Sequence, residues 1–276
     1  MTVALSNLER VLWPETGFTK GDMVDYYGGV APALLPHLSG RPLTLWRFPS
    51  GVHRRGWWQN DCRGAPGWMR TATVRGQHFC VVDDVDSLIW VANQGTIELH
   101  PFPFRADEPE RPLALVFDLD PGPPAGLEAC AEVALLLREL LADRPAFAKT
   151  SGSAGLHVHA PVHAGTTFTE AKAFARQLAE SVAAARPDLV VTTQRRSARP
   201  GKVLVDWLQN DPTRSTVAPY SLRATPRPSV STPVTWDEVA AGELAFGPGG
   251  VVRRLERHGD LLGVLLGSAR TPARRP

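Results

Sequence analysis

The sequence has few cysteines, and none of them stand close together. Cys62, Cys80 and Cys130 are odd in number and form no CxxC motif, so the sequence predicts no disulfide framework. This usage is typical of a protein from a reducing compartment. It predicts a cytoplasmic location and no structural disulfide.

The sequence also lacks long apolar runs, a signal segment and an excess of charge of one sign. No run approaches the ~20 apolar residues that span a bilayer, and residues 1–10 mix polar and charged side chains where a signal peptide would be apolar. With 30 basic and 28 acidic residues, the net charge is +2. Contact with nucleic acid therefore has to come from local basic clusters, because the field of the whole protein is weak.

What remains is the composition of a folded globular protein. Hydrophobic residues make up 43% of the 276 residues, which is enough to bury a substantial core. An acidic, proline-rich loop at residues 105–112 is a candidate boundary inside a single domain of residues 1–267. It separates an N-terminal module of about 1–105 from a catalytic core of about 112–267. Residues 268–276 are expected to form a flexible basic tail.

Local signals predict a short α/β arrangement before the boundary loop. Thr19 is placed to cap a helix over residues 20–30, and Pro36 and Gly40 end a second short helix. A further helix is expected near residues 87–94.

After the loop, the periodicity predicts strand, helix, strand, strand, helix and strand, which resembles the split βαβ arrangement. The expected strands are residues 113–119, 147–150, 156–161 and 203–208; the expected helices are residues 127–141 and residues 169–185, the latter capped by Thr167 or Thr169.

Acidic residues interrupt two of these apolar strands. Asp118 and Asp120 lie two residues apart, so their side chains point to the same side. Like charges on one face repel, and Mg²⁺ or Mn²⁺, which prefer oxygen ligands, remove that cost. Asp206 is a third charge inside an apolar strand, where an unpaired carboxylate is costly, so the three predict a shared metal site. The alternative is that Asp120 opens a turn while Asp118 pairs with an arginine. The similar stretch at residues 83–86 is interpreted as a helix cap formed by Asp86.

A glycine-rich turn precedes a strand with alternating histidines. Residues 149–159 combine glycine N–H and serine hydroxyl donors, as a phosphate cradle requires. His157 and His159 face one side of the strand, where a histidine can donate to a phosphate. With His163 they can instead form a zinc site. The third interpretation is a hairpin with a hydrogen-bonded histidine.

Basic residues flank the Asp206 strand on both sides. Their guanidinium groups suit the oxygens of a triphosphate, although a run of charge is more often a solvated face. The residues are Arg195, Arg196, Arg199 and Lys202 before the strand, and Arg214 and Arg223 after it.

Several short motifs recur in a fixed order along the chain. They are RVLWP (10–14) with GFTK (17–20), GRP (40–42), IELH (97–100), FDLDPG (117–122), TSGS (150–153), GLH (155–157), GKVLVDW (201–207) and APYSLR (218–223). In order and spacing the chain resembles the archaeo-eukaryotic primase superfamily, and most of all the polymerase domain of bacterial ligase D from non-homologous end joining. The resemblance runs from about Leu5 to Leu266.

The resemblance implies roles for matching residues. Asp118, Asp120 and Asp206 are implied as the catalytic, metal-binding aspartates. Nucleotide-binding roles are implied for His100 (near the incoming sugar), Ser151, His157, Arg199, Lys202, Gln209 and Arg223. Arg10 and Lys20 are implied for a DNA 5′-phosphate, and Trp57 and Trp58 for stacking on template bases, with core packing as the alternative for one of the two tryptophans.

Four positions depart from the family pattern. They are Arg10, which replaces a common lysine, Asn60, Ala154 and Thr225. These departures leave the aspartates intact and bear on affinity for nucleotide and template.

The resemblance implies an α+β primase-like fold, with a mixed or antiparallel sheet, an RRM-like catalytic core and a smaller N-terminal α/β module. It implies a template-dependent nucleotidyltransferase that extends 3′-hydroxyl ends at DNA breaks or short gaps and prefers ribonucleotides. Two divalent ions, Mn²⁺ or Mg²⁺, are expected to activate the 3′-hydroxyl and stabilise the leaving pyrophosphate.

The implied partners are broken or gapped DNA, nucleoside triphosphates, a DNA ligase and a Ku-type end-binding protein, with a nucleoid-associated location in a bacterium. Because the sequence contains no ligase or nuclease segment, the resemblance implies a stand-alone form. The alternative functions are a metal-dependent phosphoesterase and an inactive DNA-end-binding adaptor.

Overall fold

The computed structural model describes residues 3–141 and 143–268, and the chain forms two compact units. Unit 1 consists of Met1–Pro109, Ser215–Thr232 and Phe246–Asp260; unit 2 consists of Glu110–Arg214, Pro233–Ala245 and Leu261–Pro276. The first division lies inside the expected boundary loop. The expected core of residues 112–267 is not continuous, however, because two of its segments belong to unit 1. Residues 269–276 of the expected basic tail lie outside the described residues.

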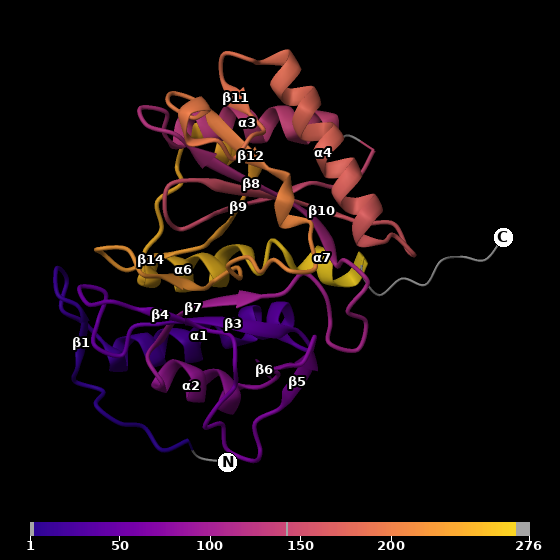
Figure 1. The fold of residues 1–276 in the computed structure, drawn as a ribbon. Coiled ribbons are helices and arrows are strands. Elements are labelled where there is room, and N and C mark those ends of the chain that lie inside the picture. Colours follow the sequence, from indigo (N-terminus) through magenta and orange to yellow (C-terminus); the bar gives the residue numbers. More distant parts are fainter. Residues whose placement is uncertain (1–2, 142, 269–276) are drawn as a thin grey trace. The chain divides into compact units, whose positions relative to one another are not determined.

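Unit 1 is built on an antiparallel sheet with the order β4-β3-β6-β5, in which β7 also pairs with β3 (Figure 1). Its strands are β3 (Pro42–Arg47), β4 (Trp57–Gln59), β5 (Thr71–Val74), β6 (Gln77–Val81) and β7 (Thr96–Pro101). The helices are α1 (Lys20–Leu38), α2 (Val85–Asn93) and α6 (Pro248–His258). Two small ribbons complete the unit: β1 (Val11–Trp13) with β2 (Phe18–Thr19), and β13 (Leu222–Arg223) with β14 (Ser229–Val230).

The start of α1 is as predicted, and its end is not. Thr19 caps the helix in a capping box with Asp22. The helix then continues through Pro32 and Pro36 to Leu38, so the two expected short helices are one. An interior proline costs ~3 kcal/mol, but the helix buries a long apolar face, and this packing outweighs the cost.

The cap of α2 is Asp84, so the expectation that Asp86 is the cap was wrong. The Asp84 carboxylate accepts a hydrogen bond from the Ser87 N–H at 2.7 Å. Asp86 lies in the first turn, where a negative charge is favoured by the helix dipole.

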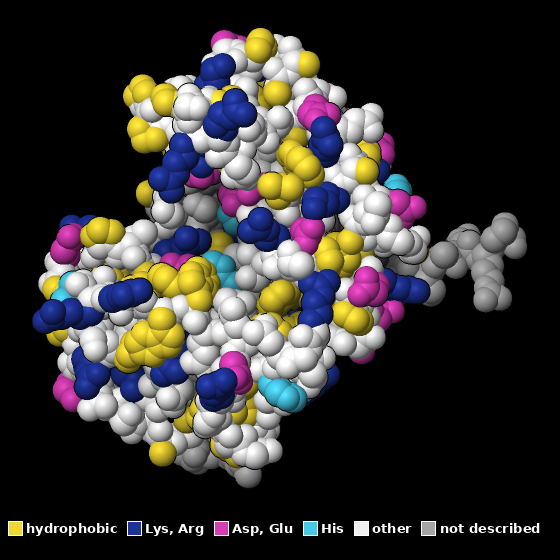
Figure 2. All heavy atoms as spheres, viewed as in Figure 1, with side chains coloured by type: hydrophobic (Ala, Val, Ile, Leu, Met, Phe, Trp, Pro, Cys, Tyr) yellow, Lys and Arg dark blue, Asp and Glu magenta, His cyan; other side chains and the backbone are white. Residues whose placement is uncertain are grey.

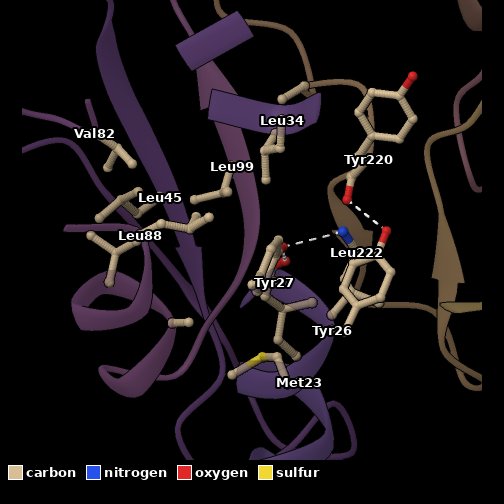
Figure 3. Close-up of a cluster of buried hydrophobic side chains, with 14 of the residues drawn as sticks. Met23, Tyr26, Tyr27, Leu34, Leu45, Val82, Leu88, Leu99, Tyr220 and Leu222 are labelled. Atoms are coloured by element: carbon tan, nitrogen blue, oxygen red, sulfur yellow. Dashed lines mark hydrogen bonds between the residues drawn. The ribbon is translucent and has the colours of Figure 1, made fainter. Parts of the chain in front are cut away.

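Two tyrosines of α1 hold the segment Ser215–Thr232 in unit 1 (Figure 3). The Tyr26 hydroxyl donates to the carbonyl of Tyr220 at 2.8 Å. The Tyr27 hydroxyl donates to the carbonyl of Ile97 and accepts from the N–H of Leu222 at 3.2 Å. Both tyrosine side chains are buried, so their hydroxyl groups need these partners.

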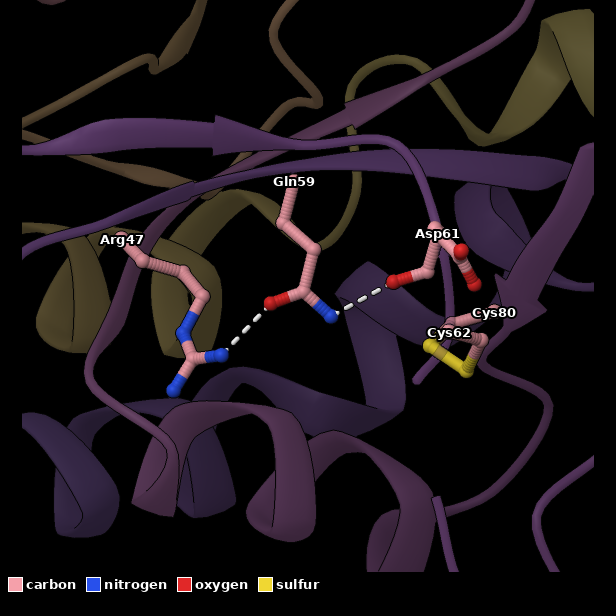
Figure 4. The surroundings of a disulfide bond; sticks show 5 residues. All are labelled: Arg47, Gln59, Asp61, Cys62 and Cys80. Carbon is pink, nitrogen blue, oxygen red and sulfur yellow. Dashed lines mark hydrogen bonds between the residues drawn. A yellow bond between two sulfur atoms is a disulfide. The ribbon is translucent and has the colours of Figure 1, made fainter. Parts of the chain in front are cut away.

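A disulfide joins Cys62 to Cys80 (Figure 4), so the expectation of no structural disulfide was wrong. The two Cα atoms are 4.9 Å apart, and the N–H of Cys62 donates to the carbonyl of His78 at 2.8 Å. The β5–β6 hairpin returns the chain to Cys62, a pairing that the sequence separation of 18 did not reveal. Cys130 is the remaining, buried thiol.

Unit 2 contains a six-stranded sheet with the order β11-β12-β8-β10-β9-β15 (Figure 1). The strands are β8 (Ala114–Pro121), β9 (Phe147–Thr150), β10 (Leu156–Pro161), β11 (Val190–Val191), β12 (Val203–Asp206) and β15 (Pro233–Val234). The helices are α3 (Leu127–Leu140), α4 (Phe168–Ala185), α5 (Trp236–Ala241) and α7 (Gly263–Ser268), with short 3₁₀ turns at Arg196–Ala198 and Trp207–Gln209.

The four central strands of this sheet confirm the split βαβ prediction. In the order β12-β8-β10-β9, every neighbour is antiparallel, as the RRM-like arrangement requires. Thr167 caps α4, which is one of the two expected caps. Strand β12 ends at Asp206, two residues before the predicted end, because a 3₁₀ turn begins at Trp207. In the described part of the chain, no helix is long and apolar enough to cross a membrane.

The two faces of strand β8 have different environments. Leu115, Phe117 and Leu119 are buried, and α3 and α4 both pack against this strand. Because side chains alternate along a strand, Asp118 and Asp120 point to the opposite face. The fold therefore presents the predicted carboxylates on the face of the sheet away from the helices.

Candidate active site

Strand register brings the third aspartate to the first pair. Asp206 on β12 lies directly opposite Asp118 on β8, and His157 on β10 lies opposite Asp118 from the other side. Directly opposed residues of antiparallel strands point to the same face. The three aspartates and His157 therefore share one face of unit 2, as the sequence predicted for Asp118 and Asp120.

Each aspartate has a different polar neighbour. The Nε2 atom of His157 lies 3.4 Å from an oxygen of Asp118. Asp206 accepts hydrogen bonds from the N–H of Leu208 at 3.0 Å and from the side-chain amide of Gln209 at 3.3 Å. The guanidinium of Arg199 binds an oxygen of Asp120. An arginine pair was the alternative interpretation for Asp118; the structure shows an arginine pair at Asp120.

The negative charge of the carboxylates affects the pKa of a buried thiol, Cys130 on α3. Burial, and to a smaller extent the nearby carboxylates of Asp120 and Asp118, raise the pKa of the Cys130 thiol to about 12. Among the described residues, no three His, Cys, Asp or Glu side chains gather closely enough to hold a metal ion. The oxygen donors fit Mg²⁺ or Mn²⁺; at Asp120 the positive charge is instead the Arg199 guanidinium.

The glycine-rich turn beside the aspartates is organised by Ser151. Its hydroxyl oxygen accepts hydrogen bonds from the N–H groups of Ser153 at 3.1 Å and Gly155 at 3.0 Å. Gly152 has a φ of 73°, which favours glycine. A side chain at Gly155 would collide with the carbonyl of Leu119. The turn is thus fixed against the strand that carries Asp118 and Asp120.

The basic residues before β12 divide into two groups. Arg199 and Arg196 line a pocket of about 220 Å³ together with Pro121, Gly122, Pro123 and Pro200, next to Asp120. The Lys202 ammonium instead donates to the carbonyl of Pro187 at 2.5 Å. Arg199 therefore meets the aspartates, and Lys202 does not.

The histidine set of the zinc alternative is dispersed. The rings of His157 and His159 are 6.1 Å apart, and Nε2 of His163 lies 3.3 Å from the guanidinium of Arg144. A cationic guanidinium at that distance disfavours a zinc ion on the same nitrogen.

Unit 1 holds a separate cluster of predicted residues around Glu98. The Nε2 atom of His100 lies 2.8 Å from one oxygen of Glu98, and Nε of Arg223 lies 3.3 Å from the other. The sequence analysis assigned His100 and Arg223 but gave Glu98 no role. The available signal was a charge inside the apolar strand at residues 96–101, the same signal that identified Asp206.

The two predicted stacking tryptophans lie on β4 and are not core residues. Trp57 is 45% exposed and Trp58 is 48% exposed, which excludes the core-packing alternative for both. The Trp58 ring packs edge-on against His100, with centroids 4.8 Å apart. The guanidinium of Arg47 lies 5.3 Å from the centre of the Trp57 ring. Figure 4 shows that Gln59 links Arg47 to Asp61, next to the disulfide.

Arg10 and Lys20 are neighbours, but they differ in availability. The N–H of Lys20 donates to the carbonyl of Arg10, so the β1–β2 turn brings both residues together. The Lys20 ammonium is buried and donates to the carbonyl of Ser6 at 2.6 Å. Burial and the charge of Arg10 both lower the pKa of Lys20. The exposed Arg10 donates to the carbonyl of Pro49 at 2.8 Å.

Basic and acidic side chains are mixed over the molecular face drawn in Figure 2, with no large field of one sign. This agrees with the near-balanced composition, in which 30 basic residues oppose 28 acidic ones. Local clusters, rather than net charge, therefore carry the electrostatics of the site.

A split βαβ sheet with two helices on one face and three aspartates on the other has the architecture of a primase-polymerase catalytic core. The model of the LigD primase-polymerase domain matches residues 19–262. The chain belongs to this family.

Relatives and a solved structure agree with that assignment. The multifunctional non-homologous end joining protein LigD of Mycobacterium bovis is 39% identical over 278 residues, which cover 94% of this chain and 36% of the relative. LigD of Bacillus subtilis is 28% identical, over 92% of this chain and 42% of its own length. The chain thus spans about a third of the length of the Mycobacterium relative.

The structural comparison extends over almost the whole chain. The polymerase domain of Mycobacterium tuberculosis ligase D in complex with DNA matches with a TM-score of 0.91 and 38% identity, covering 98% of this chain and 99% of that one. The α+β, primase-like fold and the family predicted from the sequence are both confirmed.

Proposed function

We propose that this chain catalyses template-dependent nucleotidyl transfer to a DNA 3′-hydroxyl, with Asp118, Asp120 and Asp206 as the metal-binding carboxylates. The observation that carries the proposal is their register: Asp206 opposes Asp118 on the face of unit 2 that the helices leave uncovered. When bound, two divalent ions would activate the 3′-hydroxyl and neutralise charge on the departing pyrophosphate.

The neighbouring groups of unit 2 supply contacts for the triphosphate. Ser151 donates its hydroxyl proton from a turn that its own oxygen already rigidifies. His157 adds a ring nitrogen beside Asp118. Arg199, once it leaves Asp120, offers a planar fork for phosphate oxygens. Gln209 holds Asp206 in place through its amide. Lys202 is retained only as a secondary contact, because its ammonium binds Pro187.

Unit 1 supplies the groups that the resemblance assigns to the sugar and to DNA. His100 and Arg223 address the nucleotide, and the exposed Trp57 and Trp58 stack on template bases, at ~1–3 kcal/mol per base. Arg10 carries most of the 5′-phosphate contact, because the ammonium of Lys20 is buried against Ser6.

The names of the relatives support a physiological setting for this activity. The relatives are named non-homologous end joining proteins, and the matched polymerase domain was solved in complex with DNA. We infer gap filling and end extension at breaks, with ribonucleotides preferred, Mn²⁺ or Mg²⁺ as the cofactor, and a DNA ligase and a Ku-type end-binding protein as partners.

Primer extension tests the proposal. The chain is incubated with a gapped duplex, labelled ribo- or deoxyribonucleotides, and Mn²⁺ or Mg²⁺. Wild-type protein should extend the primer by templated nucleotides, and Asp118→Ala with Asp120→Ala should abolish extension while circular dichroism shows an unchanged fold.

Two results would contradict this function. If the chain binds the gapped duplex but adds no nucleotide with either ion, it is a DNA-end-binding adaptor. If extension is absent and the purified protein contains stoichiometric zinc, the phosphoesterase alternative gains support.

A further inference from the structure

Glu98 is a buried carboxylate on β7 with three polar neighbours. Only 5% of the residue is exposed. One oxygen faces Nε2 of His100 at 2.8 Å; the other accepts from the N–H of Ala224 at 2.9 Å and lies 3.3 Å from Nε of Arg223. A buried charge is costly unless it is paired and hydrogen-bonded. The Glu98 carboxylate therefore depends on these three neighbours.

The carboxylate remains ionised in this setting. Burial by itself raises the pKa of Glu98, but the hydrogen bond from His100 and the charge of Arg223 outweigh it, and the pKa is lowered. An ionised carboxylate has only acceptor atoms. Its neighbours must therefore all act as donors.

This fixes the proton arrangement of the His100 ring. Because the Glu98 oxygen can only accept, Nε2 of His100 must carry a hydrogen. In the neutral ring, Nδ1 is then the acceptor nitrogen. Trp58 packs edge-on against the same ring at 4.8 Å, which limits its rotation. The ring is thus held in one tautomer and one orientation.

Glu98 orients Arg223 in the same way. The Nε edge of the guanidinium faces Glu98. The N–H of Ala224, the next residue, binds the same oxygen. This double contact anchors both the backbone and the side chain at the end of β13.

We propose that Glu98 is a positioning residue for nucleotide selection: it holds His100 as an acceptor for a sugar hydroxyl and Arg223 as a donor to a phosphate oxygen. The inference rests on the proposed nucleotidyl transfer and deepens it. A sugar hydroxyl that donates to Nδ1 distinguishes a ribonucleotide from a deoxyribonucleotide, so Glu98 acts on sugar choice without touching the nucleotide.

The test compares the ratio of kcat/KM for ribo- and deoxyribonucleotides. Glu98→Ala should lower this ratio about tenfold, the effect of losing one oriented hydrogen bond, and His100→Ala should lower it equally. The double variant should show no further loss, because Glu98 acts through His100. Glu256→Ala, on the exposed side of α6, is the matched control and should leave the ratio unchanged. A role limited to folding would lower total activity but not the ratio.

Glu98→Gln separates positioning from folding. Glutamine keeps the size of the side chain, but one of its two terminal atoms is a donor. It therefore cannot accept from His100 on one side and from the N–H of Ala224 on the other. We expect the melting temperature of Glu98→Gln to stay within a few degrees of the wild-type value. The variant should either lose sugar selectivity or show a raised KM for the nucleotide.

Nitrogen-15 NMR of the His100 ring gives a readout without catalysis. The nucleotide-free wild type should show the Nε2–H tautomer, and Glu98→Ala should not. If the wild type extends no primer, the proposed function fails, and NMR still decides the tautomer. If it extends but Glu98→Ala keeps the wild-type ratio, or if the two single effects add, the role of Glu98 is overturned. An unchanged ratio in His100→Ala overturns it as well.

Discussion

The guanidinium of Arg199 lies on a carboxylate oxygen of Asp120. Arg199 follows the 3₁₀ turn Arg196–Ala198, and its carbonyl packs so closely on Gly122 that no side chain fits there. The backbone contact holds this segment against the end of β8. A positive side chain is therefore built in at one of the three carboxylates that divalent ions would need.

Removing this guanidinium should make cation binding easier. We expect Arg199→Ala to bind Mn²⁺ about two- to fivefold more tightly than wild type without nucleotide or DNA, since partly exposed ion pairs contribute ~0.2–1 kcal/mol. Calorimetric titration measures this affinity. Arg196→Ala is the control, because Arg196 lines the same pocket. Equal Mn²⁺ affinity in Arg199→Ala and wild type would mean that the pair does not compete with the metal.

Nucleotide use should depend far more on Arg223 than on Arg227. Arg223 is oriented by Glu98, whereas Arg227 is exposed near the tip of the β13–β14 ribbon. A charge-assisted hydrogen bond contributes ~1.5–3 kcal/mol, so Arg223→Ala should lower kcat/KM about ten- to a hundredfold. Arg227→Ala should change it much less. Similar losses of kcat/KM for the two variants in nucleotide-titrated extension assays would mean that this loop contributes only general electrostatic attraction.

Thiol counting should reveal the disulfide directly. The native protein should show no reactive thiol at pH 8, because Cys62 and Cys80 are joined and burial raises the pKa of Cys130 to about 12. Denaturation without reductant should expose one thiol, and denaturation with reductant all three. Reduction should also lower the melting temperature, since closing a loop of this length contributes up to ~3 kcal/mol. Three thiols in the unreduced, denatured protein would exclude the disulfide.

Asp211 should make the free energy of unfolding depend on pH in the acid range. Partial burial raises the pKa of Asp211, but hydrogen bonds from Lys172 and Thr213 outweigh it and lower the pKa to about 2. A carboxyl whose pKa is lowered in the folded state contributes stability above its unfolded value of 3.8, and this is lost as the pH falls toward 2.

Asp211→Asn should therefore destabilise the protein at pH 7 by at most ~1 kcal/mol, the usual value for a partly exposed pair. Melting temperatures of variant and wild type should converge by about pH 2. Asp25→Asn, on the exposed face of α1, is the control. Its melting temperature should equal that of the wild type already at pH 7, so no convergence is expected. A constant gap between Asp211→Asn and wild type at all pH values would show that the effect is not electrostatic.

Elements with clear local signals could be predicted from the sequence. Strands β9 and β10 have the predicted bounds, and α3 differs by one residue, because periodicity and flanking glycines define them locally. Helix α1 was divided in two because proline costs are local, whereas the burial that overrides them is tertiary. The disulfide was missed for the same reason, since only the β5–β6 hairpin brings Cys62 to Cys80.

The site shows the same limit. Alternation and apolar context predicted that Asp118 and Asp120 share a face, and strand pairing brought Asp206 to them. Sequence proximity suggested that Lys202 joins Arg199, but the Lys202 ammonium donates to the carbonyl of Pro187 instead. Glu98 was passed over although its charge inside an apolar strand was a usable signal; its contacts with Arg223 and Ala224 join distant segments and could not be predicted locally.

The two units are made of six alternating segments, so the chain passes from one unit to the other five times. No single cut in the gene separates one unit from the other. A recombination point anywhere between the codons of residues 110 and 260 would give the recipient gene incomplete pieces of both. In a library of chimaeras, crossovers between these codons should therefore be tolerated less often than crossovers that divide only one unit.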